Sequence, residues 1–471
     1  MSLARPEAAA VQRARRALIG ALGTEKVLDD PDLLPKYGED YSYSGLFLPD
    51  LVVRADSAAD VQAVFRIATE EKVPVTPRGL GSGKSGGALP LAGGIVLAME
   101  RMRRVKEISA ADMLAVAEPG IITGEFMKAV EAEGLFYPPD PNSLNISSLG
   151  GNVACNAGGP RALKYGVTRN YILALEVVLP TGELLRIGRR TLKGVTGYDL
   201  VGLFVGSEGT LGVITEITAK LVGLPTAVET ALVSFPDAET ATVALAEVFR
   251  RGLVPRTLEL LDRHALDAVR RKTPGRFPEG AGAVLIVETD GRSSELAMEE
   301  LERIASCCLE RAALDVLVAQ DAAQRERIWE PRRVLSMTLA ETAPRKMSED
   351  VVVPRSQIPA LLRAAEKSSQ AHGIRVATYG HAGDGNLHVN VLFAEHEKDR
   401  ADRVVAEMME ATVSLGGTIS GEHGIGLTKR DFISLEQSEP LIALQRRMKA
   451  VFDPAHILNP GKIFPSRGTR E

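Results

Sequence analysis

Three stretches of small residues interrupt the first half of the chain, and they limit the folds that it can adopt. They lie near residues 80, 150 and 210, and the middle one, 140–159, is too rich in glycine, serine and asparagine to be predicted as a helix or a strand. A loop of this length inside a domain is usually functional or disordered, and the apolar residues spaced through it argue against disorder. Glycine-rich loops expose backbone N–H groups that bind anions. We therefore expect the three loops to surround a long cofactor with two phosphates, without a Rossmann unit.

The first loop, 77–88, nearly matches two nucleotide-binding motifs and fits neither. Residues 81–86 read G-x-G-x-x-G, but that fingerprint must open a helix, whereas a proline, two glycines and an apolar strand follow here. Residues 83–85 read G-K-S, as at the end of a P-loop, but the glycine required five residues earlier is Arg78. We expect a loop between strands whose N–H groups form an anion-binding nest beside Arg78 and Ser82. A flexible turn is the alternative for this loop taken alone.

Size and composition are those of an ordinary protein of two or three domains. The chain has 471 residues, of which 45% are hydrophobic and 25% charged, and its net charge is −5. The interspersed charges argue against a nucleic-acid binder. The three cysteines, two of them adjacent, match neither a disulfide framework nor a zinc or iron–sulfur motif. Without an apolar run of about 18 residues, a cytoplasmic protein is expected; a homodimer, and membrane association through an electron-transfer partner, are left open.

Hydrophobic periodicity predicts two α/β or α+β domains. In the first half, the predicted elements are a helix over 7–22 that ends at Gly23, a strand over 51–53, a helix from a Ser57 cap to Glu71, a strand over 73–76, a hairpin of 172–179 with 184–187, and a strand over 213–221. After a boundary at 222–226, alternating strands and helices predict a sheet covered by helices on one face. Residues 329–333, which hold the single tryptophan beside Arg332 and Arg333, are predicted as a surface helix with solvated arginines.

Two glycine-flanked windows, 380–390 and 416–426, carry the side chains most suited to chemistry. In the first, Gly-Asp-Gly-Asn predicts a tight turn between two strands, which would bring His381 and His388 together. An isolated pair of loop histidines is about as often structural as functional, but three of the seven histidines lie in these windows. Two histidines and one carboxylate commonly bind Zn²⁺ or a similar ion and leave room for a substrate.

These loops and windows resemble the D-2-hydroxyacid dehydrogenase and glycolate-oxidase FAD-subunit branch of the vanillyl-alcohol-oxidase/PCMH superfamily. The second loop, with P-D-P at 139–141 and G-G-N-V-A-C-N-A-G-G at 150–159, carries the resemblance most specifically. The resemblance implies an α+β fold, with a PCMH-type FAD-binding domain of two α+β subdomains and a ferredoxin-like α+β cap. The implied divisions are an N-terminal helical segment (1–46), the FAD-binding domain (47–225), the cap or substrate domain (226–440), and a C-terminal segment that returns to the FAD domain (441–471).

The same resemblance implies FAD, with its pyrophosphate on the first loop and its isoalloxazine near the second and third. Lys84 stands where covalent members often have histidine, so non-covalent FAD is expected. The implied FAD-binding residues are Arg78, Gly79, Gly81, Ser82, Gly83, Gly86, Gly87, Pro139, Asp140, Ser143, Ser148, Gly150, Gly151, Asn152, Ala154, Asn156, Gly158, Gly209, Gly212, Ile214 and Asn459.

The implied reaction is the oxidation of a D-2-hydroxyacid, such as D-lactate, glycolate or D-2-hydroxyglutarate, with transfer of a hydride to flavin N5. The implied site residues are the ligands His381, His388 and Glu422 of a divalent metal, expected to be Zn²⁺, the substrate contacts Arg332 and Asn390, and the catalytic base His423. Ser348 stands where the family often has lysine, which leaves one carboxylate contact open. The electron acceptor would be a flavoprotein, an iron–sulfur subunit or a quinone. Two alternatives remain: a metal-free alcohol oxidase that uses O₂, and a non-catalytic electron-relay subunit.

Overall fold

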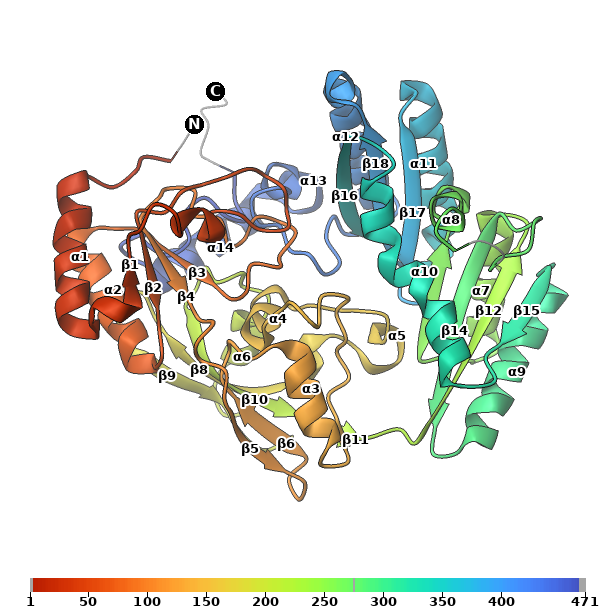
Figure 1. Cartoon of the computed structure of the whole chain (residues 1–471), viewed down its shortest axis with the longest axis horizontal. Helices are drawn as coiled ribbons and strands as arrows, with labels where there is room; N and C mark the ends of the chain where they lie inside the picture. Colours follow the sequence, from red (N-terminus) through yellow and green to blue (C-terminus); the bar gives the residue numbers. More distant parts are fainter. Residues whose placement is uncertain (1–2, 274–275, 466–471) are drawn as a thin grey trace. The chain divides into compact units, whose positions relative to one another are not determined.

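The computed structural model describes residues 3–273 and 276–465, and the chain divides into two compact units (Figure 1). The first unit comprises Met1–Ala157, Val167–Leu224 and Glu422–Glu471, and the second comprises Gly158–Gly166 and Pro225–Gly421. Neither unit is one continuous stretch of sequence. The expected domains divide the chain at other residues, since they extend the cap to 440 and assign 158–166 to the FAD-binding domain.

A four-stranded sheet in the order β1-β2-β4-β3 forms the first part of the first unit, with β2, β4 and β3 parallel. Helices α1 and α2 pack on it, and the core includes Leu18, Phe65 and Leu97. The Ser57 side chain accepts a hydrogen bond from the Asp60 N–H and caps α2, as predicted. The elements are α1 (Ala8–Leu22), β1 (Val27–Leu28), β2 (Leu51–Arg54), α2 (Ala58–Glu71), β3 (Val75–Arg78) and β4 (Ile95–Ala98).

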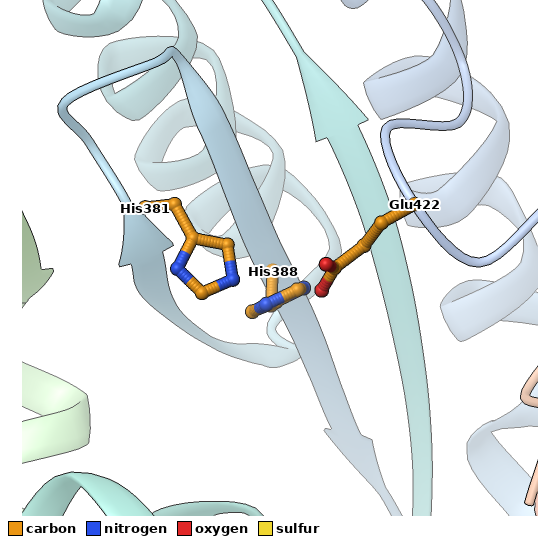
Figure 2. Close-up of side chains that lie close together, drawn as sticks. All are labelled: His381, His388 and Glu422. Atoms are coloured by element: carbon orange, nitrogen blue, oxygen red, sulfur yellow. The ribbon is translucent and has the colours of Figure 1, made fainter. Parts of the chain in front are cut away.

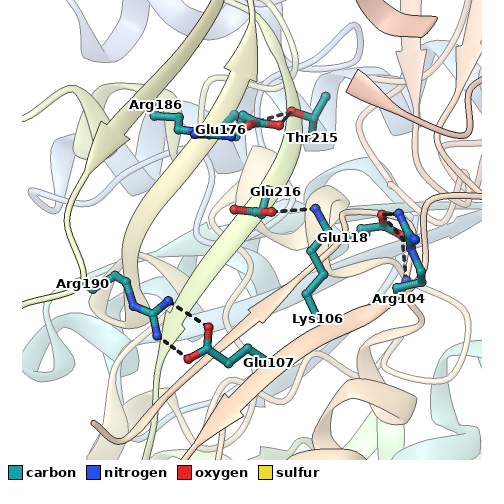
Figure 3. Close-up of polar contacts among 9 residues, drawn as sticks. All are labelled: Arg104, Lys106, Glu107, Glu118, Glu176, Arg186, Arg190, Thr215 and Glu216. Carbon is teal, nitrogen blue, oxygen red and sulfur yellow. Dashed lines mark hydrogen bonds and ion pairs between the residues drawn. The ribbon is translucent and has the colours of Figure 1, made fainter. Parts of the chain in front are cut away.

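A five-stranded antiparallel sheet in the order β5-β6-β10-β8-β9 organises the second part of the first unit, which also contains a two-stranded sheet of β11 and β7. The predicted hairpin is confirmed by the pairing of β8 with β9. Polar contacts cross this sheet (Figure 3); an ion pair of 2.6 Å joins Lys106 of β5 to Glu216 of β10, two strands that are not adjacent. The elements are β5 (Val105–Ser109), β6 (Leu114–Ala117), α3 (Thr123–Glu131), β7 (Leu135–Phe136), α4 (Leu149–Cys155), β8 (Ile172–Val178), β9 (Leu184–Gly188), α6 (Leu200–Phe204), β10 (Val213–Lys220), β11 (Val222–Gly223), α13 (Ile433–Glu436) and α14 (Glu439–Phe452).

Helix α4 lies within the stretch 140–159, so the prediction that this whole stretch is a loop is wrong for seven residues. The Ser148 side chain accepts a hydrogen bond from the Gly151 N–H and starts the helix, and Asn156 ends it in the left-handed conformation, with φ 53°. Leu149 and Val153 lie one turn apart and are fully buried. Their burial outweighs the low helix propensity of the two glycines between them.

A seven-stranded antiparallel sheet in the order β15-β12-β14-β13-β17-β18-β16 organises the second unit. Every residue of β13 and β18 is buried, because helices cover both faces of the sheet. One face packs against α8 and α10, and the other contacts α9, where Thr289 donates to the Ala297 carbonyl. The prediction of helices on one face only is therefore wrong. The elements are β12 (Ala227–Phe235), α7 (Ala238–Arg250), β13 (Thr257–Leu261), α8 (Arg263–Arg270), β14 (Ala283–Gly291), α9 (Ser294–Glu310), β15 (Asp315–Val318), α10 (Ala322–Ala340), β16 (Arg345–Val352), α11 (Ile358–His372), β17 (Arg375–His381), β18 (Asn386–Phe393) and α12 (Lys398–Ser414).

The short segment Gly158–Gly166, which begins with the last two residues of the second loop, is part of the second unit. Its helix α5 (Ala162–Tyr165) is held by the buried carboxylate of Asp290 on β14. Lys164 Nζ lies 2.5 Å from Asp290 Oδ1, and the Tyr165 hydroxyl donates to Asp290 Oδ2 at 2.7 Å. Among the helices of the described residues, none is long and apolar enough to cross a membrane.

Candidate functional site

The three glycine-rich loops meet within the first unit, and the C-terminal tail joins them. The Asn459 side-chain amide donates to the carbonyls of Gly87 in the first loop and Glu208 in the third loop (206–215), each at 3.0 Å. The Glu208 N–H donates to the carbonyl of Ala154 in the second loop at 2.7 Å. One cradle therefore contains residues that lie far apart in the sequence.

Two glycines allow the loops to approach this closely. A Cβ atom at Gly79 would lie 2.3 Å from Ser148 Oγ, so the first and second loops could not keep their present separation with a larger residue. A Cβ atom at Gly209 would lie 2.8 Å from Pro77 Cγ, and Gly209 also has a φ of 64°. Both positions need glycine for the space that it leaves, and Gly209 needs it for its backbone conformation as well.

The polar groups of this cradle fit an anionic ligand that carries hydroxyl groups. Arg78 ends β3 and is 9% exposed; it donates through Nη2 to the Lys36 carbonyl, while its buried Nη1 has no partner among the described residues. The Oδ1 atom of Asn459 is likewise buried without a protein partner. Buried polar groups are normally satisfied, so a cation and an acceptor left open here match the phosphates and hydroxyls of a flavin dinucleotide.

Several implied FAD-binding residues of the second loop make contacts that stabilise the fold. The Asn152 amide donates to Thr123 Oγ1 at 2.7 Å and fastens α4 to α3, and Ser148 caps α4. A Cβ atom at Gly150 would meet Pro119 at 2.5 Å. Gly158 belongs to the second unit. Contact of these residues with FAD stays a prediction.

Two charged residues of the first unit, Asp40 and Lys462, are not among the site residues predicted from the sequence. Asp40 has a buried Oδ2 without a partner in the described structure, and burial raises the pKa of this carboxyl. Lys462 donates to the Leu89 carbonyl beside the first loop, and burial lowers the pKa of its amine to about 7. Neither lies in a periodic or glycine-rich stretch. The one available signal was that Lys462 lies three residues after Asn459, in the C-terminal segment that the resemblance assigns to the FAD domain.

The hairpin of β17 and β18 brings His381 and His388 together, as the sequence predicted. Tyr379 pairs with His388 across the strands, and the two imidazole centroids are 5.3 Å apart. Both histidines are buried. One ligand atom each from His381, His388 and Glu422 lie within 4.8 Å of one another, and Figure 2 shows the three side chains pointing toward a common point. The donor set is that of an open Zn²⁺ site.

Asp350 fixes the chain just before Glu422. It pairs with His388 across β16 and β18, is fully buried, and accepts hydrogen bonds from the Gly421 N–H at 2.9 Å and the Ser420 hydroxyl at 3.2 Å. The residue after Glu422 is His423, and its backbone carbonyl accepts a hydrogen bond from Ser85 Oγ at 2.9 Å. The His423 Nε2 lies 4.0 Å from Glu422 Oε1.

A buried carboxylate on β13 joins His381 to Arg332. Glu259 Oε1 accepts a short hydrogen bond from His381 Nδ1, and Glu259 Oε2 accepts one from Arg332 Nε at 2.6 Å. Burial acts to raise the pKa of Glu259, but His381 and Arg332 outweigh it and hold this pKa at about 2. The Arg332 guanidinium lies over the Tyr379 ring, 4.8 Å from its centroid.

The prediction of a solvated surface helix at 329–333 is wrong. Trp329 is 8% exposed and Arg332 5%, because this side of α10 packs on the sheet. Trp329 Nε1 donates to the buried Glu288 at 2.7 Å. Arg333 alone fits the prediction, with a side chain 47% exposed. The sequence did not predict this buried side of α10, because a proline at position 331 interrupts the helical pattern and polar residues are mixed with apolar ones.

Two neutral polar atoms lie on the same face of the sheet as His388. The Asn390 amide donates to the carbonyls of Ala377 and His388, which leaves its buried Oδ1 without a partner among the described residues. Ser348 pairs with Asn390 across β16 and β18, and its Oγ is also buried without a partner there. Lys346, two residues earlier, donates to Ser336 of α10.

Comparison with known proteins agrees with this architecture. Residues 49–188 match the family described as FAD binding domain, and residues 224–463 match FAD linked oxidases, C-terminal domain. The glycolate oxidase subunit GlcD of Bacillus subtilis is 40% identical over 88% of this chain and 89% of its own length. The D-2-hydroxyglutarate dehydrogenase of Stutzerimonas stutzeri is 34% identical over 93% and 96%.

A further relative and a solved structure also match most of the chain. The D-lactate dehydrogenase of Anaerostipes hadrus is 36% identical over 88% of this chain and 89% of its own. The fold also matches a solved p-cresol methylhydroxylase, with a TM-score of 0.81, 17% identity and 98% of both chains covered. With two family matches and relatives aligned over most of its length, the chain belongs to the FAD-linked oxidases and is an FAD-dependent oxidoreductase.

Proposed function

We propose that this protein oxidises a D-2-hydroxyacid to the 2-oxoacid with non-covalently bound FAD and a divalent metal. The observation that carries the proposal is the convergence of His381, His388 and Glu422. Its support from the comparisons is that relatives are named glycolate oxidase subunit, D-lactate dehydrogenase and D-2-hydroxyglutarate dehydrogenase. Neither a metal-free alcohol oxidase nor a non-catalytic relay subunit needs such a cluster.

Each residue of the proposed site has a separate role in the reaction. His381, His388 and Glu422 would hold a divalent ion, which would supply the Lewis acid that lowers the pKa of the substrate hydroxyl, and the loops of the first unit would hold FAD, which would supply the hydride acceptor. The His423 imidazole accepts the hydroxyl proton. Arg332 holds the substrate carboxylate with its terminal amino groups, since its Nε already donates to Glu259. Asn390, whose buried Oδ1 has no partner among the described residues, is the second proposed substrate contact.

Ser348 bears on how many carboxylates the substrate carries. It offers one hydroxyl, without charge, opposite Asn390, where the family often has lysine. A second carboxylate placed there would lose its hydration without gaining a cation, which is costly in a buried site. We therefore propose a hydroxyacid with one carboxylate, such as D-lactate or glycolate, over D-2-hydroxyglutarate. In the Ser348→Lys variant, the preference should move toward D-2-hydroxyglutarate.

The electron acceptor is proposed to be a partner protein. Relatives from Bacillus subtilis and Escherichia coli are named as subunits of glycolate oxidase. Within the described residues the three cysteines are free and two of them are buried, and their spacing matches no iron–sulfur motif. Electrons would therefore leave the flavin for a group outside this chain.

Anaerobic mixing of the yellow protein with D-lactate, glycolate and D-2-hydroxyglutarate tests the proposed activity. One of the monocarboxylates should bleach the flavin absorbance most rapidly. Bleaching by an aromatic alcohol alone would instead support the metal-free oxidase, and no bleaching by any of these compounds would support a relay subunit. Acid denaturation should release the FAD into solution; flavin that stays with the precipitate would contradict non-covalent binding.

The variant His388→Ala tests the metal. It should lose both bound metal and flavin bleaching while it retains FAD, because His388 belongs to the second unit and the FAD cradle to the first. His396→Ala is the matched control, since His396 is exposed. Unchanged activity of His388→Ala would remove the metal from the mechanism.

A further inference from the structure

We propose that Glu259 is a positioning residue that sets the orientation of both His381 and Arg332, so that one carboxylate controls metal affinity and hydroxyacid affinity together. This inference rests on the proposed function, because it takes His381 as a metal ligand and Arg332 as the substrate-carboxylate clamp. Glu259 itself touches neither the metal nor the substrate in this proposal.

The fold places Glu259 between these two residues. In the ladder of β13 and β17, Leu261 pairs with Tyr379 and Leu260 with Gly380, so Glu259 comes beside His381 on the same face. Helix α10 packs on this face through Trp329 and Leu335, and its Arg332 reaches the same carboxylate. Each carboxylate oxygen then has its own partner, His381 Nδ1 on Oε1 and Arg332 Nε on Oε2. The Glu259 side chain is fully buried, so water does not compete for these contacts.

The contact with His381 decides which ring nitrogen can bind an ion. An ionised carboxylate only accepts hydrogen bonds, so the proton of a neutral His381 resides on Nδ1. The lone pair is then on Nε2, the atom left to act as a ligand. A carboxylate behind a ligating histidine fixes the ring orientation and raises its basicity, and the loss of such a partner typically weakens metal binding by about 10–100-fold.

The contact with Arg332 decides which edge of the guanidinium meets the substrate. Because Nε donates to Glu259 and the guanidinium plane lies over Tyr379, the remaining paired donors are Nη1 and Nη2. These two parallel donors match a carboxylate in a bidentate contact. Without Glu259, Arg332 would keep its charge but lose this fixed direction.

Glu288 provides a matched control on the neighbouring strand β14. It is also a buried carboxylate, 7% exposed, and it accepts from Trp329 Nε1 at 2.7 Å and Thr230 Oγ1 at 2.9 Å. Its partners are neither proposed ligands nor substrate contacts. A general loss of stability after removal of a buried charge should therefore appear in both Glu259→Gln and Glu288→Gln, whereas positioning effects should appear in the first alone.

The experiment compares these variants as full-length, FAD-loaded protein. Zn²⁺ affinity is measured by competition with a chromophoric chelator, and hydroxyacid binding by anaerobic flavin reduction with the monocarboxylate that bleaches the wild-type protein. Glu259→Gln should lose about 10–100-fold in Zn²⁺ affinity. With zinc saturating, its half-saturating hydroxyacid concentration should still rise by about tenfold, while Glu288→Gln should match the wild type in both measurements.

A second variant and a double variant complete the test. If Glu259→Gln does not fold, Glu259→Asp keeps the charge and should show smaller losses in the same two quantities. Arg332→Lys should keep wild-type Zn²⁺ affinity, and its effect on hydroxyacid binding should not add to that of Glu259→Gln, since both changes disturb one contact.

The outcomes separate the inference from the function on which it rests. Wild-type affinities in Glu259→Gln, or equal losses in Glu288→Gln, would overturn the role of Glu259 and leave the proposed reaction intact. A wild-type protein that takes up no divalent metal, or whose flavin no hydroxyacid reduces, would instead refute the proposed function itself, whatever the Glu259 variants show.

Discussion

Asp350 Oδ2 accepts a hydrogen bond from the Gly421 N–H at 2.9 Å, one residue before Glu422. The other oxygen of the same carboxylate accepts from the Asn386 side chain at 2.6 Å, and Asn386 follows the turn between the two strands that carry His381 and His388. Asp350 therefore fixes the chain next to all three proposed metal ligands.

Asp350→Asn should weaken this arrangement without changing the volume of the side chain. The loss of charge-assisted hydrogen bonds should lower the free energy of unfolding by about 1.5–3 kcal/mol, and bound metal should dissociate more readily. Urea denaturation and metal analysis after dialysis measure the two effects. The control is Asp431→Asn, whose side chain is 73% exposed; an equal loss of metal in that variant would argue against a specific role for Asp350.

Gly209→Ala should lower FAD affinity, because its new Cβ would meet Pro77 Cγ at 2.8 Å and push the first loop away. Gly134→Ala is the matched control: its φ of 70° is nearly the same as the 64° of Gly209, but a Cβ there meets nothing within 4 Å. Both variants should lose about 1–2 kcal/mol of stability through backbone strain. FAD titration followed by flavin fluorescence should separate them, and equal FAD affinities would show that the loops can move apart at little cost.

Arg332→Lys should raise the KM for the hydroxyacid by about 10–100-fold and change kcat less, since lysine cannot form the bidentate contact. Arg333→Lys should leave both constants unchanged, because the Arg333 side chain is 47% exposed. Steady-state kinetics with an artificial electron acceptor measure the two constants. A KM for Arg332→Lys equal to that of the wild type would contradict the role of Arg332 as the carboxylate clamp.

Lys462 should make stability depend on pH between 7 and 9. Burial lowers its pKa to about 7 in the folded protein, whereas its ordinary value is 10.5. Above pH 7 the unfolded chain therefore binds a proton that the folded chain does not, so the free energy of unfolding should rise with pH, by at most about 1.4 kcal/mol per pH unit. Above pH 9 the Cys155 thiol opposes this rise, because burial raises its pKa to about 12.

Urea denaturation at pH 7, 8 and 9, at equal FAD occupancy, measures this dependence. Lys462→Met should remove the rise, and Lys398→Met should retain it, since Lys398 is 54% exposed. The same slope in Lys462→Met and the wild type would mean that another group titrates in this range.

The sequence predicted well what depends on local patterns. The caps and ends of α2 and α1, the hairpin after β8, and the turn that joins His381 to His388 all follow from turn residues and periodicity. What it did not predict depends on packing between distant segments. Helix α4 forms because Leu149 and Val153 are buried, and α10 turns Trp329 and Arg332 inward.

Glu259 shows the same limit at the site. Its neighbours in the sequence are leucines of an ordinary buried strand, and nothing in that pattern distinguishes it from Glu288 on the next strand. Its two partners lie 122 and 73 residues away in the chain. A carboxylate of this kind becomes recognisable only when strand register and helix placement are known.

The small helix α5 limits which segments of the gene can be exchanged by recombination without breaking a contact. Residues 158–166 belong to the second unit, where Lys164 and Tyr165 hold Asp290, yet the residues on either side belong to the first. No single pair of cuts in the gene would therefore release either unit whole. A recombination that replaced residues 225–421 by those of a distant relative would place Lys164 and Tyr165 beside a residue other than Asp290 wherever the relative differs at that position. The residues at positions 164, 165 and 290 should therefore change together in functional recombinants.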